Sequence, residues 1–532
     1  MRRILLLLLI ITFCIESSFS QLESSAFSAT GRGGVATTFV TDYQTIGINP
    51  ANLGFVKSFR DPLITIGFGE FSSTITAEPL TRDELFNSFF KTETTNLTFA
   101  EKEQAVARFA DKSIGVNIDA MLFGFSIHLP RNIGVAVSVR DRVQLYTRLG
   151  RGASELAFLG ANSSYFPNLL LSDGSQVFNP RNPTVSAAYE DVIGTPLPSL
   201  SEEEQSAVVL GFFDEQRLND ELGITDLESF SSKDLLSNSR ISASWFREYN
   251  ISIGGRIYDS YNLSVYAGVG YREIRGLLVV DLEISEGSDS TIFDQNYLSV
   301  ATGLIDFDQF QVRDGATFKD FLFPSGVAKG RGFDFGATFV IKRNLYIAAS
   351  VTNVGQITSG DSTYSVGGQN LIEQFGGFGL SNYNLIGSQE NGFAIGGDNS
   401  PIDWTPQPIR KVDLPSNFRF GASYEYLRTL HIGFDVVIPL NDVAGNLEEP
   451  LYAIGGDFRF SKIFKLSSGV NIGGNNGGKI NIPLGITYIA KKGFYEAGIA
   501  TRDFATYLSN SEGSTLSFAS GFLRFKLGTI KQ

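Results

Sequence analysis

Period-two alternation of apolar and polar residues is the strongest pattern in this chain. Between residues 417 and 426, Phe418 and Phe420 fall on one face of an extended strand, while Arg419 falls on the other. The run over residues 430–438 repeats this alternation after a gap of only three residues. The pattern therefore predicts a hairpin of two amphipathic strands joined by a tight turn.

The same alternation recurs along most of the chain and predicts fourteen strands. They fall at residues 62–76, 114–130, 132–149, 240–258, 261–284, 330–342, 344–358, 415–427, 429–440, 450–461, 463–474, 480–490, 493–506 and 513–529. Short connections alternate with long ones, of which the longest is residues 150–239. Tight periplasmic turns and long external loops are typical of outer-membrane barrels. We therefore predict an all-β fold, a closed antiparallel transmembrane β-barrel of about 14 strands with both chain ends in the periplasm; counts of twelve and sixteen stay open.

Two of the long connections carry signals for the start of a helix. Ser201 with Glu204, and Thr81 with Glu84, match a capping box, and apolar residues follow each of them. We therefore predict that the external loops are partly helical. Their apolar faces either line a hydrophobic entry groove or simply cover the mouth of the barrel.

The first twenty residues predict a secretory signal peptide. Two arginines precede an apolar run over residues 4–15, and Ser18 and Ser20 are the small residues before a cleavage site at Gln21. Cys14, the only cysteine, lies inside this run, so the exported chain has no thiol for a disulfide, a metal site or a nucleophile. No later apolar run reaches the roughly 18 residues that a helical membrane span needs. We therefore expect a protein that crosses the membrane as a barrel.

The composition agrees with a barrel wall and argues against some partners. Only 19% of the residues are charged, 12% are aromatic, and the chain has 45 Phe and 56 Gly. A wall that faces lipid uses aromatic side chains directly, and outer-membrane lipid is the first expected partner. The formal net charge is −13, which argues against nucleic acid as a partner because phosphate binding needs clustered Lys and Arg.

The sequence shows no arrangement of residues that is typical of an enzyme. His128 and His431 are the only histidines, and neither has a His or Cys nearby for a zinc site or a Ser-His-Asp triad. Gly31-Arg32-Gly33-Gly34-Val35-Ala36 matches a dinucleotide fingerprint by its letters alone, because no βαβ unit surrounds it. We expect no catalytic site, no cofactor and no metal.

The residues before the first predicted strand resemble the N-terminal signature of the FadL-type outer-membrane family. They run from Ala26-Phe27-Ser28-Ala29-Thr30-Gly31 to Ala36, then Thr41-Asp42, then Gly47-Ile48-Asn49-Pro50-Ala51-Asn52-Leu53-Gly54-Phe55. In that family a Gly- and Ala-rich segment, an Asp and an Asn-Pro-Ala-x-Leu motif enter the lumen as a hatch before a fourteen-stranded wall. The resemblance implies the hatch residues Gly31, Gly33, Gly34, Asp42, Asn49, Pro50, Ala51 and Leu53. It divides the chain into a signal peptide (1–20), a hatch segment (21–61) and a barrel (62–532).

Charged residues on the polar faces of three consecutive predicted strands are candidates for lining the lumen. They are Arg419, Glu425, Asp435, Asp457 and Arg459. If these residues meet inside the barrel, opposite charges pair across strands and hold the hatch. Guiding a ligand is the alternative role.

Within the superfamily the chain is most similar to a branch from Bacteroidetes-type bacteria that includes the type IX secretion protein PorV. Residues 333–355 and 414–421 carry this similarity, and residues 500–503 and 521–525 resemble an uncharacterised family within the branch. The resemblance implies an outer-membrane barrel that binds or passes hydrophobic or amphipathic small molecules. The alternative is a PorV-like scaffold whose external loops hold a secreted cargo or another envelope protein.

Overall fold

The structure is a computed structural model. This structure describes residues 26–55, 62–84, 99–159, 237–283, 328–359 and 411–528, the last range with gaps of one to five residues. It also describes short pieces at 297–300, 305–306, 311–312, 323–324, 326, 364–366 and 404–406. The predicted signal peptide, residues 56–61 and the predicted helix start at Ser201 lie outside the described residues. The division of the chain at residues 20 and 61 therefore stays a prediction.

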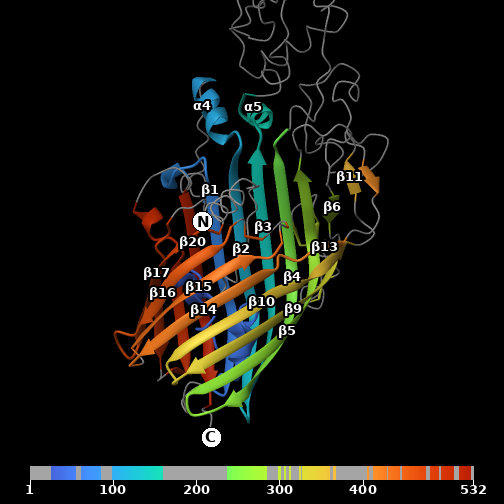
Figure 1. The fold of residues 1–532 in the computed structure, drawn as a ribbon. Coiled ribbons are helices and arrows are strands. Elements are labelled where there is room, and N and C mark those ends of the chain that lie inside the picture. The colour runs from blue at the N-terminus through green and yellow to red at the C-terminus, as the bar shows by residue number, and fades with distance from the viewer. Residues whose placement is uncertain are drawn as a thin grey trace, which may run out of the picture.

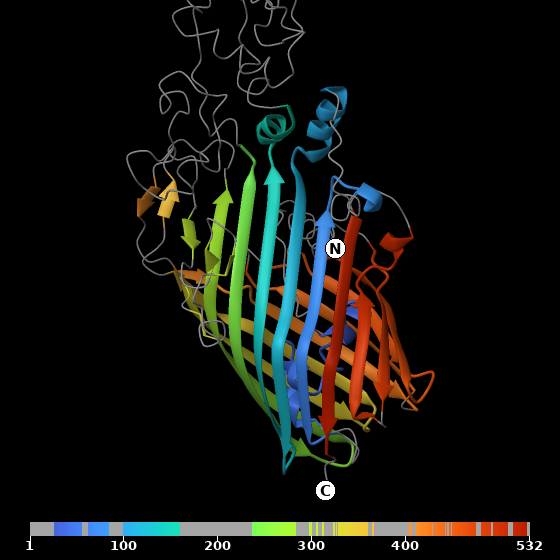
Figure 2. The same cartoon turned by 180° about the vertical axis from the view of Figure 1, so that it is seen from behind.

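Fourteen antiparallel strands form one closed wall. In order around the barrel they are β1 (Ile64–Ala77), β2 (Lys112–Leu129), β3 (Ile133–Leu149), β4 (Arg240–Asp259), β5 (Leu263–Glu283), β9 (Ala328–Ile341), β10 (Leu345–Ser359), β14 (Asn417–Tyr426), β15 (Leu430–Pro439), β16 (Leu451–Phe458), β17 (Phe464–Ile472), β18 (Leu484–Ala490), β19 (Tyr495–Thr501) and β20 (Ser514–Leu527). The ring closes where β20 pairs with β1, a contact that we call the seam (Figure 2). This pairing confirms the predicted all-β barrel.

Short and long connections alternate at the two ends of the barrel, as the sequence predicts. The three-to-five-residue turns lie at one end, which we call the turn end, together with the described C-terminus (Figure 1). The long connections lie at the opposite loop end, where α4 (Phe99–Phe109) and α5 (Arg151–Leu159) stand above the wall. The short strands β6 (Tyr297–Val300), β7 (Ile305–Asp306), β8 (Gln311–Val312), β11 (Tyr364–Val366), β12 (Trp404–Pro406) and β13 (Lys411–Asp413) belong to these connections.

The wall is apolar outside and polar inside. On β9 the side chains of Phe335 and Phe339 are 49% and 40% exposed, whereas those of Asp334 and Thr338, each directly before one of them, are buried. Because successive side chains of a strand point to opposite faces, the Phe side chains face outward and the polar ones face the lumen. Such a surface is suited to lipid outside and to polar contacts inside. In the part of the chain that the structure describes, no helix has the length and apolar character needed to cross a membrane.

The predicted capping box at Thr81 anchors the first long connection. Oε2 of Glu84 accepts hydrogen bonds from the backbone N–H and the hydroxyl of Thr81, both at 2.9 Å. Two guanidinium nitrogens of Arg108, on α4, also donate to Glu84 at 2.9 and 2.8 Å. These bonds tie α4 to the end of β1, while the apolar residues that follow Glu84 lie outside the described residues.

The contact between Glu84 and Arg108 is expected to weaken in acid. The hydrogen bonds from Arg108 lower the pKa of Glu84 from its ordinary 4.5 to about 2. A lowered pKa contributes stability that is full above about pH 4.5 and is lost as the pH falls toward 2. Because Glu84 is 41% exposed, the contribution is below about 1 kcal/mol. Hydrogen-exchange protection of α4 should fall between pH 5 and pH 3 in the parent protein. Glu84→Gln should remove that pH dependence, and an equal fall in both proteins would contradict the assignment.

Candidate functional site: the segment inside the barrel

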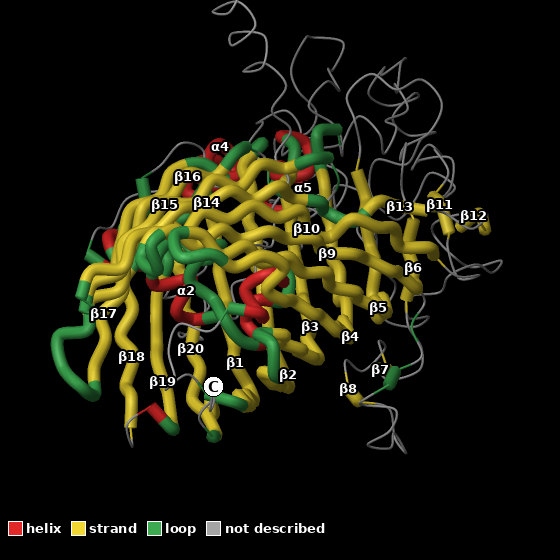
Figure 3. The backbone as a smooth tube through the Cα atoms, turned by 60° about the horizontal axis from the view of Figure 1, so that its bottom comes forward, coloured by secondary structure: helices red, strands yellow, loops and turns green. Residues whose placement is uncertain are grey.

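Residues 26–55 lie inside the barrel and are almost all buried. The segment consists of α2 (Phe27–Gly31) and two 3-10 turns, η1 (Tyr43–Thr45) and η2 (Pro50–Gly54). The barrel encloses α2 (Figure 3), which contacts β17 to β20, while η2 packs on β3, β4, β5 and β9. The segment therefore crosses the lumen from one side of the wall to the other.

Short polar side chains start the two 3-10 turns. The carboxylate of Asp42 accepts a hydrogen bond from the backbone N–H of Gln44, and Oδ1 of Asn49 accepts one from Ala51. Pro50 occupies the first position of η2, where a missing N–H costs nothing. The Asp and the Asn-Pro-Ala-x-Leu motif thus have a local structural role, since they bend the chain so that it can cross the barrel.

Glycines on the inner face of the wall make room for the segment. At thirteen of the fourteen strands a Cβ on one glycine would meet the segment closely: Gly67, Gly124, Gly134, Gly254, Gly268, Gly336, Gly421, Gly433, Gly455, Gly469, Gly485, Gly498 and Gly521. Four of them, Gly134, Gly254, Gly268 and Gly336, stand directly opposite one another across β3, β4, β5 and β9. We call these thirteen residues the glycine belt. Only Gly has no Cβ, so the belt lets backbone lie against backbone.

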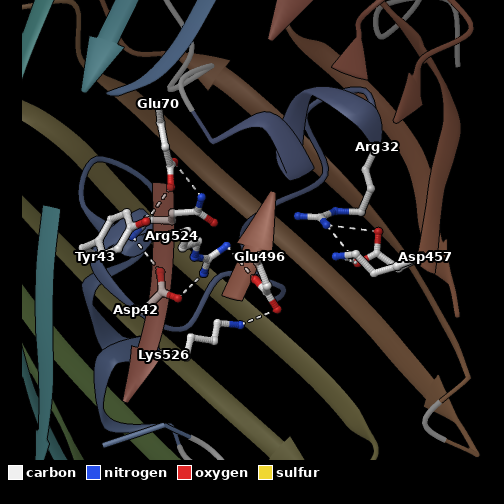
Figure 4. Close-up of polar contacts among 10 residues, drawn as sticks. Arg32, Asp42, Tyr43, Glu70, Asp457, Glu496, Arg524 and Lys526 are labelled. Carbon is white, nitrogen blue, oxygen red and sulfur yellow. Dashed lines mark hydrogen bonds and ion pairs between the residues drawn. The ribbon is translucent and has the colours of Figure 1, made fainter. Parts of the chain in front are cut away.

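One ion-pair cluster binds Arg32 of the segment to β16. The guanidinium of Arg32 donates to both carboxylate oxygens of Asp457, at 3.2 and 3.0 Å (Figure 4). Asp457 also accepts from Lys465 at 3.1 Å and from Ser467 at 2.6 Å. The guanidinium carbon of Arg32 lies 4.5 Å from the centre of the Phe39 ring, so the two ends of residues 32–39 lie close together.

A second cluster binds Asp42 and Tyr43 at the seam. Arg524, on β20, pairs with Asp42 and with Glu496, whose other partner is Lys526 (Figure 4). Tyr43 donates a hydrogen bond of 2.5 Å to Glu70, on β1, which accepts another from Gln44 at 2.8 Å. Side chains from both strands of the seam therefore hold the middle of the segment.

The last part of the segment, residues 46–55, contacts the wall through uncharged side chains. Asn49 donates to the Thr338 hydroxyl at 2.9 Å, and that hydroxyl donates to Oδ1 of Asn52 at 2.7 Å. The Phe55 ring contacts Tyr266 and Tyr346, with centroids 5.5 and 5.1 Å away. This part is fixed by close packing and neutral hydrogen bonds.

A cavity of about 190 Å³ opens at the turn end, beside the Arg32 cluster. Its lining is almost entirely polar: Glu425, Thr429, His431, Asp457, Arg459, Lys465, Ile489 and Glu496. His431 stacks on Phe39 of the segment, with ring centroids 3.8 Å apart. Two lining residues of the cavity, Asp457 and His431, therefore also contact Arg32 and Phe39 of the segment.

Toward the loop end the lumen is lined by buried charges. Arg272 donates to Glu248 at 3.1 Å and to Asp334 at 2.7 Å. Arg142 lies 3.1 Å from Glu248, and Arg140 stands directly opposite Glu248 across β3 and β4. These charged side chains are at most 5% exposed and form a network of ion pairs inside the barrel. Among the described residues, no group of three His, Cys, Asp or Glu side chains is placed to hold a metal ion.

The five lumen candidates separate into two groups. Asp435 lies against the segment and accepts from the backbone N–H of Ala36 and from Thr37, and Arg419 is its diagonal neighbour across β14 and β15. The other three, Glu425, Asp457 and Arg459, line the turn-end cavity, and Arg459 is exposed just past the end of β16. They do not meet at one point, since the strands place them at different depths.

Sequence reasoning missed the seam cluster. Tyr43, Glu70, Glu496 and Arg524 were not among the predicted site residues, although Glu70 is the one charged residue of β1 and Arg524 is one of two on β20. Of the predicted hatch residues, Gly31, Asn49, Pro50, Ala51 and Leu53 are buried against the wall, Gly33 and Gly34 adopt positive φ, and Asp42 binds Arg524.

These observations define the class of structure: a closed antiparallel barrel whose own N-terminal segment crosses the lumen. The chain belongs to the family of unknown function DUF5723, whose model matches residues 226–492, half of the chain. No curated protein matches the sequence.

The solved structures similar to this chain include FadL-family channels, as the sequence resemblance led us to expect. The P. putida toluene transporter TodX is 9% identical, with a TM-score of 0.40 over 94% of this chain and 98% of its own. The CymD monoaromatic hydrocarbon channel is 10% identical, with 0.40 over 95% and 98%, and a Pseudomonas aeruginosa FadL homologue is 10% identical, with 0.38 over 97% and 99%. These TM-scores are low, so the barrel assignment rests on the strand pairing itself.

Proposed function

We propose that this chain is an outer-membrane channel for small hydrophobic or amphipathic molecules, with residues 26–55 as its hatch. The observation that carries the proposal is the segment itself, which crosses a closed barrel and contacts its wall on both sides. A barrel that only anchors other proteins does not need thirteen wall glycines that leave room for an internal segment. A channel that must stay shut against leakage does need such a closure.

The outer face of the barrel supports a place in the outer membrane. Rings of Phe458, Phe460, Phe464 and Tyr488 neighbour one another near the turn end, with centroids 5.6 to 6.4 Å apart. Aromatic side chains gather at the membrane interface of transmembrane barrels. Because the periplasmic turns of such barrels are short and the external loops long, we assign the turn end to the periplasm and the loop end to the cell exterior.

The lining of the lumen favours amphipathic molecules within the proposed class. The buried arginines and carboxylates around Glu248 offer hydrogen-bond and charge partners that a bare hydrocarbon cannot use. These groups already pair with one another, Arg272 with Glu248 and Asp334, and Arg142 with Glu248. The polar end of an amphipathic molecule can interact with them, whereas a bare hydrocarbon gains nothing from their charge.

Uptake by whole cells tests the channel directly. A strain without this protein should take up radiolabelled decanoate several-fold more slowly than the parent, and expression of the intact chain should restore the rate. Arabinose, which is small and fully polar, serves as the matched control and should enter both strains equally. Equal decanoate uptake with and without the protein would rule out this function.

The scaffold alternative is not carried further. It depends on external loops that hold a partner protein, and residues 160–236 and 367–403 of those loops lie outside the described residues. No contact among the described residues favours it over the channel.

A further inference from the structure

The outer face of the barrel changes from apolar to charged toward the loop end of β9. The outward residues nearer the turn end are Phe333, Phe335, Ala337, Phe339 and Ile341. They span roughly 27 Å of strand, or about 20 Å of membrane at the usual tilt, close to the apolar band of about 25 Å on transmembrane barrels. The next two outward residues, Arg331 and Lys329, are charged and exposed. These cations therefore lie just beyond the lipid-facing band.

Strand pairing continues this charged region from β9 onto β5, β10 and β13. Residues directly opposite each other in a sheet point to the same face, so the partners of Arg331 and Lys329 also point outward. Two rows result: Glu273, Arg331, Gln356 and Asp413 nearer the turn end, and Arg275, Lys329, Thr358 and Lys411 nearer the loop end. We call these residues the outer patch.

The two carboxylates of the outer patch have neighbours within it. Glu273 lies 3.6 Å from Arg275, which also donates to the carbonyl oxygen of Pro324 at 3.1 Å. Asp413 accepts a hydrogen bond of 2.9 Å from Gln356. The patch contains four cations and two carboxylates, so its net charge is positive in a chain whose formal net charge is −13. The patch therefore suits an anion.

The row nearer the loop end brings like charges together. Arg275 and Lys329 stand directly opposite each other on β5 and β9, and like charges at such positions repel. The side chains of Lys329, Arg331 and Lys411 are exposed, and no ion pair holds any of them among the described residues. An anion bound along this row would offset the repulsion and accept hydrogen bonds from these cations.

Apolar and aromatic side chains lie directly beside the outer patch, toward the turn end. Tyr271 and Phe333 are the next outward residues of β5 and β9, and their ring centroids are 5.5 Å apart. Val354, opposite Phe333 on β10, is also exposed. Aromatic rings of membrane proteins lie at the level of the headgroups, beside the start of the acyl chains. A ligand with phosphate groups and acyl chains therefore matches both the patch and the surface next to it.

The outer patch is confined to one side of the barrel. At the loop ends of β15, β17 and β18 the exposed outward residues are apolar: Ile438, Leu440, Ile472, Ile480 and Ile482. A general attraction to an anionic membrane surface would be served by cations spread around the whole wall. Cations gathered on neighbouring strands instead indicate a site for a single headgroup.

We propose that the outer patch binds the phosphate groups of the phosphorylated glycolipid that forms the outer leaflet of bacterial outer membranes. This inference rests on the membrane orientation assigned under the proposed function, but it does not require transport. Arg275, Lys329 and Lys411 bind the phosphate oxygens. The acyl chains lie along Tyr271 and Phe333, on the outer face of β5 and β9.

A charge-removing variant of the full-length protein tests the site. The patch variant combines three changes: Lys329→Gln, Arg331→Gln and Lys411→Gln. The control variant removes three exposed cations from turns at the opposite end of the barrel: Lys342→Gln, Arg343→Gln and Lys462→Gln. Both variants keep a polar side chain at every changed position, and each is used only if it migrates as a folded barrel in an unheated gel.

Native mass spectrometry of the purified proteins measures binding, with phosphorylated lipid A as the probe. The parent and the control variant should bind this lipid equally, and the apparent affinity of the patch variant should be lower by roughly ten-fold or more. Lipid A without its phosphate groups should bind the parent no better than it binds the patch variant. Binding to the parent should weaken as the salt concentration rises.

Three results would overturn this inference. Equal binding of phosphorylated lipid A by the parent and the patch variant would remove the site. Displacement of lipid A by an equal concentration of inorganic pyrophosphate would show a site for free phosphate. Equal affinity of the parent for phosphatidylglycerol would show charge attraction without preference for the outer-leaflet lipid. Decanoate uptake that does not depend on the protein would refute the channel but leave these binding results unchanged, so the two failures are distinguishable.

Discussion

Gly254→Ala is expected to destabilise the protein by about 1–3 kcal/mol and to displace the segment from the lumen. The new methyl group would lie against the carbonyl oxygen of Pro50 and near the Leu53 side chain, and a rigid barrel strand cannot move away from it. Gly255→Ala is the matched control, because its methyl group would meet Ile133 at 3.5 Å, an ordinary contact distance. The two changes are chemically identical and one residue apart.

Denaturant unfolding and limited trypsin digestion together check this prediction. Arg32 is 2% exposed, so trypsin should not cut after it in the parent protein or in Gly255→Ala. Cleavage after Arg32 should appear in Gly254→Ala while the barrel still migrates as a folded species. Equal stability and equal resistance of the two variants would show that the glycine belt does not determine how the segment fits.

Arg524→Met is expected to cost about 3–5 kcal/mol, the usual loss when one partner of a buried ion pair is removed. Arg524 is the cation shared by Asp42 and Glu496, and its guanidinium lies 5.6 Å from the Tyr43 ring centre. Without Arg524 the buried carboxylate of Asp42 keeps no ion pair among the described residues. Lys526→Met should cost less, because Lys526 is 21% exposed and water can replace its contact.

A double-mutant cycle gives the sharper test of this ion pair. Asp42→Asn combined with Arg524→Met removes both charges, so the double variant should be more stable than Arg524→Met alone. The free energy of unfolding in lipid vesicles measures each corner of the cycle. If the two single costs simply add, Asp42 and Arg524 are not energetically coupled and the seam cluster does not hold the segment.

The strands of the barrel could be predicted because their pattern is local. Alternation needs only a run of about ten residues, and it placed all fourteen wall strands within a few residues of their observed ends. The strands β6, β11, β12 and β13 were missed, since three or four residues are too few for alternation to be visible. β6 and β13 pair with the wall strands β5 and β10, while β12 pairs with β11 and β11 also pairs with β6.

The contacts of the segment could not be predicted, because they are long-range. Arg32 meets Asp457 and Asp42 meets Arg524 across more than 400 residues of chain, and no spacing rule connects such positions. The glycine belt was hidden for another reason. A glycine within a strand gives only a weak signal, which a bulge or a nearby ligand explains equally well.

The seam has a consequence for how the barrel assembles. β1 and β20 are the first and last wall strands, so bringing them together closes a loop of nearly the whole chain, the step with the largest entropic cost. Asp42 and Tyr43 reach Arg524 on β20 and Glu70 on β1, so a segment already in position draws the two free edges toward each other. A segment in place before closure would therefore offset part of the entropic cost of joining the two edges.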